Sequence, residues 1–382
     1  MIKIGILLPR STYYQSIGID IYEGLKLGFS YLGKENLKII TENIGFGVDK
    51  TQCYKSAEKL LLEEEVDLVF AYIGQQAAEL IKPLFLATQK ILVVLDAGAH
   101  LPNEYPKCAN IIFLSLHNSL SSWFTSRRAF QDGYDQAGMV TGYYDGGYLH
   151  TLSISKGFEN TSGHIVFNHA TSYIKEDFSM TPLTEFLNAH PKSALLTLFS
   201  GDFVQWFFDE IKSKIKTTEL PIYMTTFGLE ESVLEQTFYP NHQIKGVVAW
   251  SKHLDNPLNR TFIQKRSEKA KKATIFSLLG WESAQLASDL SELLEKHHGN
   301  ISDVAKALSF HTFESPRGTM KFNFETNTFI APLYEVSVEE MNGFCCLKVE
   351  NKIEDVVDEY EKMIQIKPEA LRSSWHNSYT CI

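Results

Sequence analysis

The sequence contains little cysteine, little basic charge and no long apolar run. Five cysteines among 382 residues are too few and too scattered to form a disulfide framework. Lys and Arg number 36 against 46 Asp and Glu, and the net charge of −10 argues against a phosphate backbone as partner. The apolar runs, such as 91–95, are far shorter than the roughly 20 residues of a membrane-spanning helix. We therefore expect no nucleic-acid partner and no membrane-embedded segment.

Catalytic and cofactor-binding motifs are also missing. The sequence has no G-x-G-x-x-G after its first apolar run, no P-loop, no H-E-x-x-H and no G-x-S-x-G. The 12 histidines show no spacing typical of zinc ligands. We therefore expect no cofactor, no metal and no enzymatic activity, and an enzyme with an unrecognised site is the least favoured alternative.

Two local patterns have simple structural interpretations. The basic run 265–272 is broken by Ser267 and Glu268, so we interpret it as a solvated helix face. The adjacent Cys345 and Cys346 predict two strand positions that face opposite sides rather than a disulfide.

The chain does contain a regular alternation of short apolar runs and amphipathic segments. The first round predicts strands at 2–8, 38–41, 68–72 and 91–95 and helices at 17–32, 51–64 and 75–88. A second round predicts strands at 136–143, 164–168, 194–199, 222–226 and 246–250 and helices at 149–159, 180–189 and 203–214. This alternation is typical of parallel, doubly wound sheets, and its duplication predicts an α/β fold with two lobes.

After residue 250 the pattern changes. A long amphipathic helix is predicted at 273–296, followed by short antiparallel strands at 319–324, 333–338 and 344–349 and a last helix at 354–363. The polar stretch 366–382 is predicted to be a surface tail.

Five motifs occur in an order that one family shares. They are IKIGILLP at 2–9 with YEGLKLG at 22–28, FAYIG at 70–74, ILVVLDA at 91–97, VTGYYDGGY at 140–148 and ESPRGTMKF at 314–322. In this order they resemble type I periplasmic binding proteins of the branched-chain amino acid and amide class, the leucine-binding-protein-like receptors of ABC transporters. The resemblance covers residues 1 to about 360.

The resemblance implies two Rossmann-like lobes with parallel sheets, joined by a three-strand hinge. Lobe I would combine 1–118 with 252–332 and lobe II would combine 119–251 with 333–365, and 366–382 would be a C-terminal tail. A small polar molecule, such as an amino acid, an amide or a related compound, would bind in a cleft that closes by hinge motion. The chain would then be the solute-binding component of an ABC-type importer, with an ABC permease as partner.

A second function stays open at this point. The same fold kept in the cytoplasm would be a ligand sensor that signals to a partner protein. The chain enters a predicted strand at Ile2 with no leader-like segment before it. Location therefore depends on the start: cytoplasmic if Met1 is native, periplasmic by resemblance if a leader was removed.

Candidate ligand-binding residues follow the strand ends, because such folds bind ligands beyond the carboxyl ends of their strands. In lobe I they are Ser11, Thr12, Tyr13, Gly74, Gln75, Asp96, Ala97 and Gly98. In lobe II they are Tyr148, Ser200, Gly201, Asp202, Phe227 and Gly228. A carboxylate of Asp96 in the cleft would repel an anion, so we hypothesise a neutral or cationic polar ligand with an aromatic or apolar part. Asp96 as a helix cap is the alternative.

Overall fold

The apolar runs form the strands of two sheets in the computed structural model, which describes residues 3–34, 37–99, 108–144, 149–215, 219–235, 242–341, 343–366 and 377–380. The chain divides into two units. Unit 1 comprises Met1–Leu116, Asp255–Ala331 and Trp375–Ile382, and unit 2 comprises His117–Leu254 and Pro332–Ser374. Both units are doubly wound α/β structures, so the predicted fold class is confirmed.

Unit 1 is built on a sheet of eight strands in the order β11-β12-β13-β5-β4-β3-β1-β2. The parallel part comprises β1 (Lys3–Leu8), β2 (Lys38–Asn43), β3 (Leu68–Tyr72), β4 (Ile91–Asp96) and β5 (Ile111–Ser115). The sheet continues with β13 (Thr328–Ile330), which pairs in parallel with β5, and with the antiparallel β12 (Gly318–Asn323) and β11 (Thr312–Ser315). Every residue of β3, β4 and β5 is buried because helices cover both faces of this sheet.

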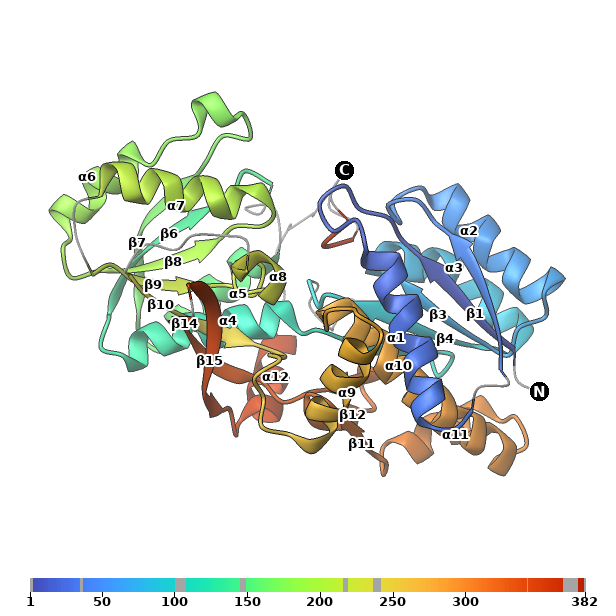
Figure 1. Ribbon diagram of the computed structural model, residues 1–382. Helices are drawn as coiled ribbons and strands as arrows, with labels where there is room; N and C mark the ends of the chain where they lie inside the picture. The colour runs from blue at the N-terminus through green and yellow to red at the C-terminus, as the bar shows by residue number, and fades with distance from the viewer. Residues whose placement is uncertain are drawn as a thin grey trace. The chain divides into compact units, whose positions relative to one another are not determined.

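The helices of unit 1 lie in two layers. α1 (Ile17–Tyr31) and α10 (Ile275–Lys296) lie on one face of the sheet, and α2 (Lys50–Glu58) and α3 (Gln75–Thr88) lie on the other (Figure 1). Two shorter helices, α9 (Pro257–Glu268) and α11 (Ile301–Leu308), flank α10 in sequence.

Glycines allow α1 and α10 to approach closely. A Cβ on Gly24 would lie 2.1 Å from the carbonyl oxygen of Ser277, and one on Gly280 would lie 2.1 Å from the carbonyl oxygen of Ile21. No side chain fits at these distances, so the two backbones meet only because both positions are glycine.

We predict that Gly24→Ala destabilises the protein by about 1–3 kcal/mol, because the added methyl group forces the helices apart. In a helix without such a contact, the same substitution would be stabilising by roughly 1 kcal/mol, because alanine has a higher helix propensity than glycine. Urea unfolding of wild type and Gly24→Ala measures the effect, and Lys26→Ala, at an exposed position of the same helix, serves as the control. Equal stability of the two variants would contradict the close packing.

A buried ion pair joins α10 to the β11–β12 hairpin. The Arg317 guanidinium donates to both carboxylate oxygens of Glu282, at 2.8 and 2.7 Å, and to the carbonyl oxygen of Ser115 at 2.9 Å. The hydroxyl of Ser315 also donates to Glu282. Both charged side chains are fully buried, and the guanidinium meets the carboxylate in the bidentate fork geometry of strong charge-assisted hydrogen bonds.

We predict that Arg317→Met alone lowers the free energy of unfolding by about 3–5 kcal/mol, because it leaves the Glu282 carboxylate buried and unpaired. The double variant Glu282→Leu, Arg317→Met should be clearly more stable than Arg317→Met, because it removes both charges. Chemical denaturation of the three proteins tests this order. A double variant no more stable than the single one would contradict it.

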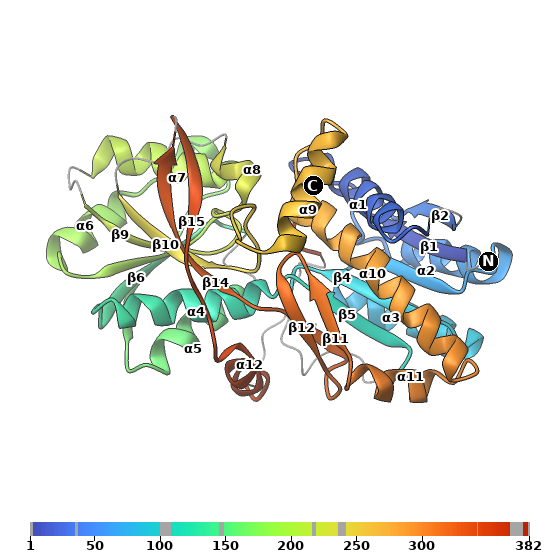
Figure 2. The same cartoon turned by 60° about the horizontal axis from the view of Figure 1, so that its bottom comes forward.

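Unit 2 repeats the strand pattern of unit 1. Its sheet has the order β15-β14-β10-β9-β8-β6-β7. The parallel strands are β6 (Gln136–Thr141), β7 (His164–Ala170), β8 (Ala194–Leu198), β9 (Pro221–Met224) and β10 (Gln243–Val248). β14 (Tyr334–Met341) and β15 (Phe344–Lys352) form a long, twisted antiparallel hairpin beside β10 (Figure 2).

Helices again cover both faces. α4 (Asn118–Gln131) and α5 (Leu149–Glu159) lie on one side of the unit 2 sheet, and α6 (Thr181–Ala189) and α7 (Asp202–Lys214) lie on the other (Figure 1). The unit also contains the short α8 (Glu231–Leu234) and α12 (Val356–Ile364). Glu359 of α12 accepts a hydrogen bond from the indole N–H of Trp123 on α4 at 3.0 Å.

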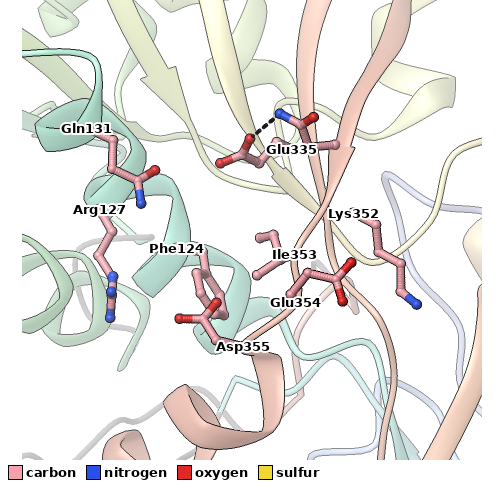
Figure 3. A pocket seen from close by; sticks show the side chains of 9 residues that line it. Phe124, Arg127, Gln131, Glu335, Lys352, Ile353, Glu354 and Asp355 are labelled. Carbon is pink, nitrogen blue, oxygen red and sulfur yellow. Dashed lines mark hydrogen bonds between the residues drawn. The ribbon is translucent and has the colours of Figure 1, made fainter.

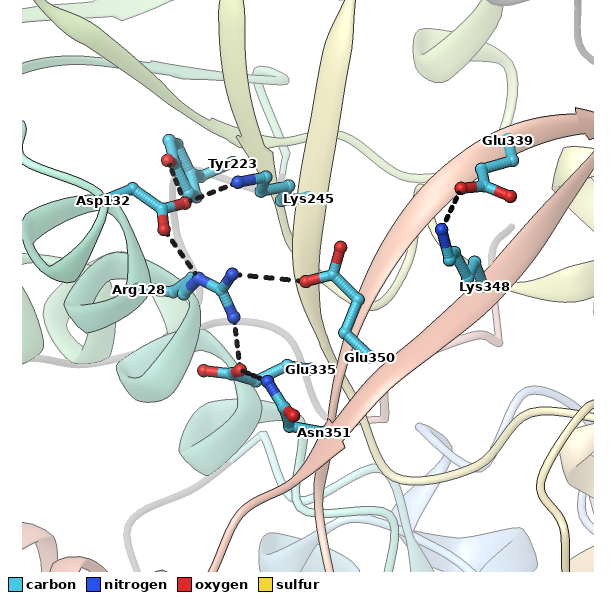
Figure 4. Close-up of polar contacts among 9 residues, drawn as sticks. All are labelled: Arg128, Asp132, Tyr223, Lys245, Glu335, Glu339, Lys348, Glu350 and Asn351. Carbon is cyan, nitrogen blue, oxygen red and sulfur yellow. Dashed lines mark hydrogen bonds and ion pairs between the residues drawn. The ribbon is translucent and has the colours of Figure 1, made fainter.

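A charge network attaches α4 to the strands of unit 2 (Figure 4). Arg128 donates to Asp132 at 3.0 Å and to Glu350 of β15 at 3.2 Å. Asp132 also accepts from the Tyr223 hydroxyl at 2.6 Å and the Lys245 ammonium at 2.9 Å. Burial alone would raise the pKa of Asp132, but these hydrogen bonds hold its pKa below the usual value. The carboxylate therefore stays charged and links β9, β10 and α4.

Several elements differ from the sequence-based predictions. The pattern did not predict β5, β11, β13, α8, α9 or α11. The interpretation of 265–272 as a solvated helix face is wrong for Arg266, which is 2% exposed and donates to Asp20 at 2.7 Å and to Glu23 at 3.1 Å. This arginine instead joins α9 to α1.

The prediction of a surface tail is also wrong for 377–380, because these residues are buried against unit 1. The cysteines agree better with expectation: Cys53, Cys108, Cys345 and Cys346 are free, and Cys345 and Cys346 are neighbours on β15. None of the helices in the described part of the chain combines the length and the apolarity needed to cross a membrane.

Candidate functional site

The strand order of unit 1 reverses between β1 and β3. Chain segments that leave these two strands turn to opposite faces of the sheet, and ligands of open α/β sheets bind at the carboxyl ends of strands at such a switch point. The loop after β1 contains the predicted residues Ser11, Thr12 and Tyr13, and the loop after β3 contains Gly74 and Gln75. The fold therefore places both groups of predicted residues at one edge of the unit 1 sheet.

The loop after β1 is organised by its own side chains. Ser11 is buried, and its hydroxyl accepts the backbone N–H of Tyr14 at 3.1 Å. Thr12 is exposed and Tyr13 is half-buried, with its ring 4.8 Å from the ring of Tyr14. Of the three predicted residues in this loop, Thr12 and Tyr13 are therefore the accessible ones.

The two neighbouring strand ends differ in accessibility. Gly74 is buried and caps α3, and Gln75 is the half-buried first residue of that helix. Asp96 ends β4, is 3% exposed, and accepts the backbone N–H of Gly98 at 3.1 Å. Gly98 has φ +68°, a conformation that favours glycine, and Ala97 is buried. Asp96 thus closes a turn, and no helix begins at 97–99.

Unit 2 has the same reversal between β6 and β8. The loop after β8 contains Ser200, Gly201 and Asp202, and Asp202 is the exposed first residue of α7. The predicted Tyr148 follows β6 in sequence but lies outside the described residues. Ser200, Gly201 and Asp202 therefore stand at the switch point of unit 2.

Phe227 and Gly228 lie elsewhere on that edge. They form a turn after β9, in which the Gly228 N–H donates to the carbonyl of Thr225 at 3.2 Å. The Phe227 ring is buried and lies 5.1 Å from the ring of His150, near the start of α5. The fold thus brings His150, which the sequence analysis missed, next to a predicted residue.

Buried hydroxyl groups on the same edge were also missed. Thr171 follows β7, Thr197 lies near the end of β8, and Thr225 and Thr226 follow β9. All four are buried, and their Oγ1 atoms have no hydrogen-bond partner among the described residues. Such groups are costly unless something pairs with them, so they mark this edge as a polar surface that a ligand could satisfy. The sequence signal that could have identified these residues was the occurrence of threonine at or just after the ends of the apolar runs.

An exposed aromatic cluster accompanies these hydroxyls. Tyr143 and Tyr144 follow β6 and Tyr173 follows β7, with ring centroids 5.1–6.0 Å apart. Tyr143 is 53% exposed and Tyr173 is 50% exposed. Phe203 of α7 extends the cluster, 6.2 Å from Tyr144. The carboxyl edge of unit 2 therefore presents aromatic rings to its surroundings.

A buried carboxyl group, that of Glu230, lies just after the turn formed by Phe227 and Gly228. Glu230 accepts the backbone N–H of Ser232 at 3.0 Å, and burial, aided by the neighbouring Glu231 carboxylate, raises its pKa to about 7. Glu231 accepts from the Ser251 hydroxyl at 2.8 Å and from the Lys252 N–H at 3.1 Å. Glu230 therefore changes charge near neutral pH.

We predict that Glu230→Gln changes the pH dependence of stability. A carboxyl group whose pKa is about 4.5 unfolded and about 7 folded favours the folded state at low pH and loses that contribution as pH rises from 4.5 to 7. The stability of Glu230→Gln relative to wild type should therefore rise by up to about 3 kcal/mol across this interval. Thermal unfolding from pH 4 to 8 measures it.

The exposed Glu219→Gln serves as the control and should show no such rise. A difference between Glu230→Gln and wild type that stays constant with pH would contradict the raised pKa.

A small cavity in unit 2 lies apart from these predicted residues. It has a volume of about 180 Å³ and is lined by side chains of α4, β14 and β15 and by residues 353–355 (Figure 3). Its lining combines the basic Arg127 and Lys352 with the acidic Glu335, Glu354 and Asp355. Its mixed charge and its size, below the roughly 300 Å³ of common ligand pockets, make it a poor candidate for the solute site.

Within the described residues, no group of three His, Cys, Asp or Glu side chains could hold a metal ion.

Two doubly wound units with polar and aromatic residues at their switch points define a class of two-lobed α/β binding proteins. A family model described as "Periplasmic binding protein" matches residues 1–343. The chain belongs to the periplasmic binding protein family, and the predicted resemblance is confirmed.

Solved structures similar to the chain share its fold over almost their whole length. A substrate-binding protein of an ABC transporter from Sphaerobacter thermophilus has a TM-score of 0.80 and 16% identity, covering 93% of this chain and 98% of that one. A solute-binding protein from Rhodopseudomonas palustris in complex with 3,4-dihydroxybenzoic acid has a TM-score of 0.76 and 17% identity, covering 94% and 99%.

A leucine-binding protein from Thermotoga maritima is also similar, with a TM-score of 0.68 and 14% identity, covering 94% and 100%. No curated protein matches the chain by sequence.

Proposed function

We propose that this chain is the solute-binding component of an ABC-type importer and delivers its solute to a membrane permease. The observation that carries the proposal is the repeated strand reversal, which gives each unit a crevice-forming edge with accessible polar residues. A ligand that contacts both edges would favour a closed arrangement, because only that arrangement offers both sets of contacts.

We propose further that the solute is a neutral or cationic polar molecule that carries an aromatic ring. The exposed tyrosines 143, 144 and 173 supply ring-binding surface, and the threonine hydroxyls of the same edge, which have no hydrogen-bond partner among the described residues, supply polar contacts. The carboxylates of Asp96 and Asp202 at the two edges disfavour an anion. The benzoate-type ligands named for several structural neighbours support the ring but not its charge.

Three ligands with one ring and different charges test this proposal. We predict that tyramine and 4-hydroxybenzamide bind at least about tenfold more tightly than 4-hydroxybenzoate in isothermal titration, a difference of about 1.4 kcal/mol. Asp96→Asn should reduce this preference, whereas Asp209→Asn, an exposed carboxylate on α7, should leave it unchanged.

Tight binding of leucine or 4-hydroxybenzoate that is unaffected by Asp96→Asn would overturn the ligand class. Failure of amino acids, amides, amines, sugars and aromatic acids alike to raise the melting temperature would count against solute binding itself, because a ligand at about 100 times its Kd adds about 2.7 kcal/mol.

A further inference from the structure

The last described residues of the chain lie on the predicted ligand-binding edge of unit 1. Asn377 donates its side-chain N–H to the carbonyl of Tyr72 at 3.1 Å, and the Tyr72 hydroxyl donates to the carbonyl of Ser378 at 3.0 Å. Tyr72 ends β3, two residues before Gly74. The segment 377–380 is therefore attached to the carboxyl end of the strand that borders the switch point.

The ring of Tyr379 fills an aromatic pocket at this edge. Its centroid lies 5.1 Å from the ring of Tyr14 and 5.4 Å from the ring of Phe276, and both pairs are nearly perpendicular. Tyr14 and Phe276 are themselves 5.6 Å apart. Tyr379 is 4% exposed, although it belongs to a polar stretch near the chain end. Edge-to-face contacts of this kind favour any phenol-sized ring at the same place.

The pocket residues belong to the elements that carry the predicted ligand-binding residues. Tyr14 directly follows Ser11, Thr12 and Tyr13, and Phe276 is the second residue of α10. Gly47, with φ +72°, leaves room on the β2–α2 side, where a Cβ would lie 2.9 Å from the Asn377 amide nitrogen. A ligand bound at this edge and the C-terminal segment would therefore compete for the same surface.

The docking of this segment is incomplete in one respect. The hydroxyl of Ser378 is buried and has no hydrogen-bond partner within the described part of the chain. A buried hydroxyl without a partner opposes docking. Docking is instead favoured by the covalent connection, since a tethered group competes at an effective concentration in about the millimolar range. A modest intrinsic affinity is then sufficient to fill the pocket and still allows displacement.

We propose that residues 377–380 form an internal plug: Tyr379 occupies a subsite for the aromatic ring of the solute, and the solute must displace it to bind unit 1. The proposal rests on the proposed function for its ring-bearing ligand. It predicts that the full-length chain binds such ligands more weakly than a chain without the plug, and that the C-terminal segment sets the concentration at which the protein responds.

The test uses 4-methylphenol, which is the tyrosine side chain as a free molecule. We expect a chain that ends at residue 376 to bind 4-methylphenol at least about tenfold more tightly than the full-length chain, measured by isothermal titration. A chain that ends at Thr380 keeps the described segment and should behave like the full-length chain. The peptide Asn-Ser-Tyr-Thr-Cys-Ile, added to the shortened chain, should compete with 4-methylphenol.

Two further measurements do not depend on the shortened chain. In the full-length protein, Tyr379→Ala should also tighten 4-methylphenol binding, and saturating 4-methylphenol should increase hydrogen exchange at the amides of 378–380. Equal affinities of Tyr379→Ala and wild type, or exchange at 378–380 that does not change, would overturn the plug.

The outcomes separate this inference from the proposed function. If tyramine or 4-hydroxybenzamide binds the full-length chain and neither removal of 377–382 nor Tyr379→Ala changes the affinity, only the plug is wrong. A different result would leave the plug standing and show that the proposed solute is wrong. In that case the shortened chain binds 4-methylphenol and the peptide displaces it, while tyramine and 4-hydroxybenzamide bind to none of the variants.

Discussion

In each unit, the first strand of the parallel sheet has later strands on both of its sides, and this constraint organises everything else. Because right-handed crossovers then place the helices that follow the first and third strands on opposite faces, the loops after these two strands diverge at one edge. Exposed polar residues such as Thr12 and Asp202 lie at that edge, while β3, β4, β5 and β8 stay fully buried. The chemistry of the edge can vary without disturbing the core that supports it.

Hydrogen bonds between charged side chains attach the later, antiparallel strands to these parallel cores. Arg317 and Glu282 hold the β11–β12 hairpin against α10 in unit 1, and Arg128 links α4 to β15 in unit 2. Neither hairpin belongs to the repeated βα pattern. The Arg317–Glu282 pair is fully buried, so the loss of either partner is strongly destabilising, whereas the Arg128–Glu350 contact is only partly buried.

The aromatic residues divide into two groups with different roles. Tyr143 and Tyr173 are exposed on unit 2, and their ring surfaces are open to a ligand. Tyr14 and Phe276 of unit 1 are covered by Tyr379, which comes from the end of the chain. If the solute carries a ring, as we propose, the two units differ in how accessible their aromatic residues are to it. The rings of unit 2 are exposed, whereas those of unit 1 are covered by a tyrosine, whose side chain resembles the ring of the ligand.

The sequence alone determined the fold class and most of the repeated elements, because burial on both faces of a parallel sheet leaves apolar runs that alternate with amphipathic helices. It also placed candidate residues such as Gln75 and Ser200 at strand ends, which is a local property. It could not reveal that Arg266 is buried, that His150 meets Phe227, or that Tyr379 lies against Tyr14. Each of these contacts joins segments distant in sequence, and neither periodicity nor composition encodes such partners. Only the tertiary structure decided them.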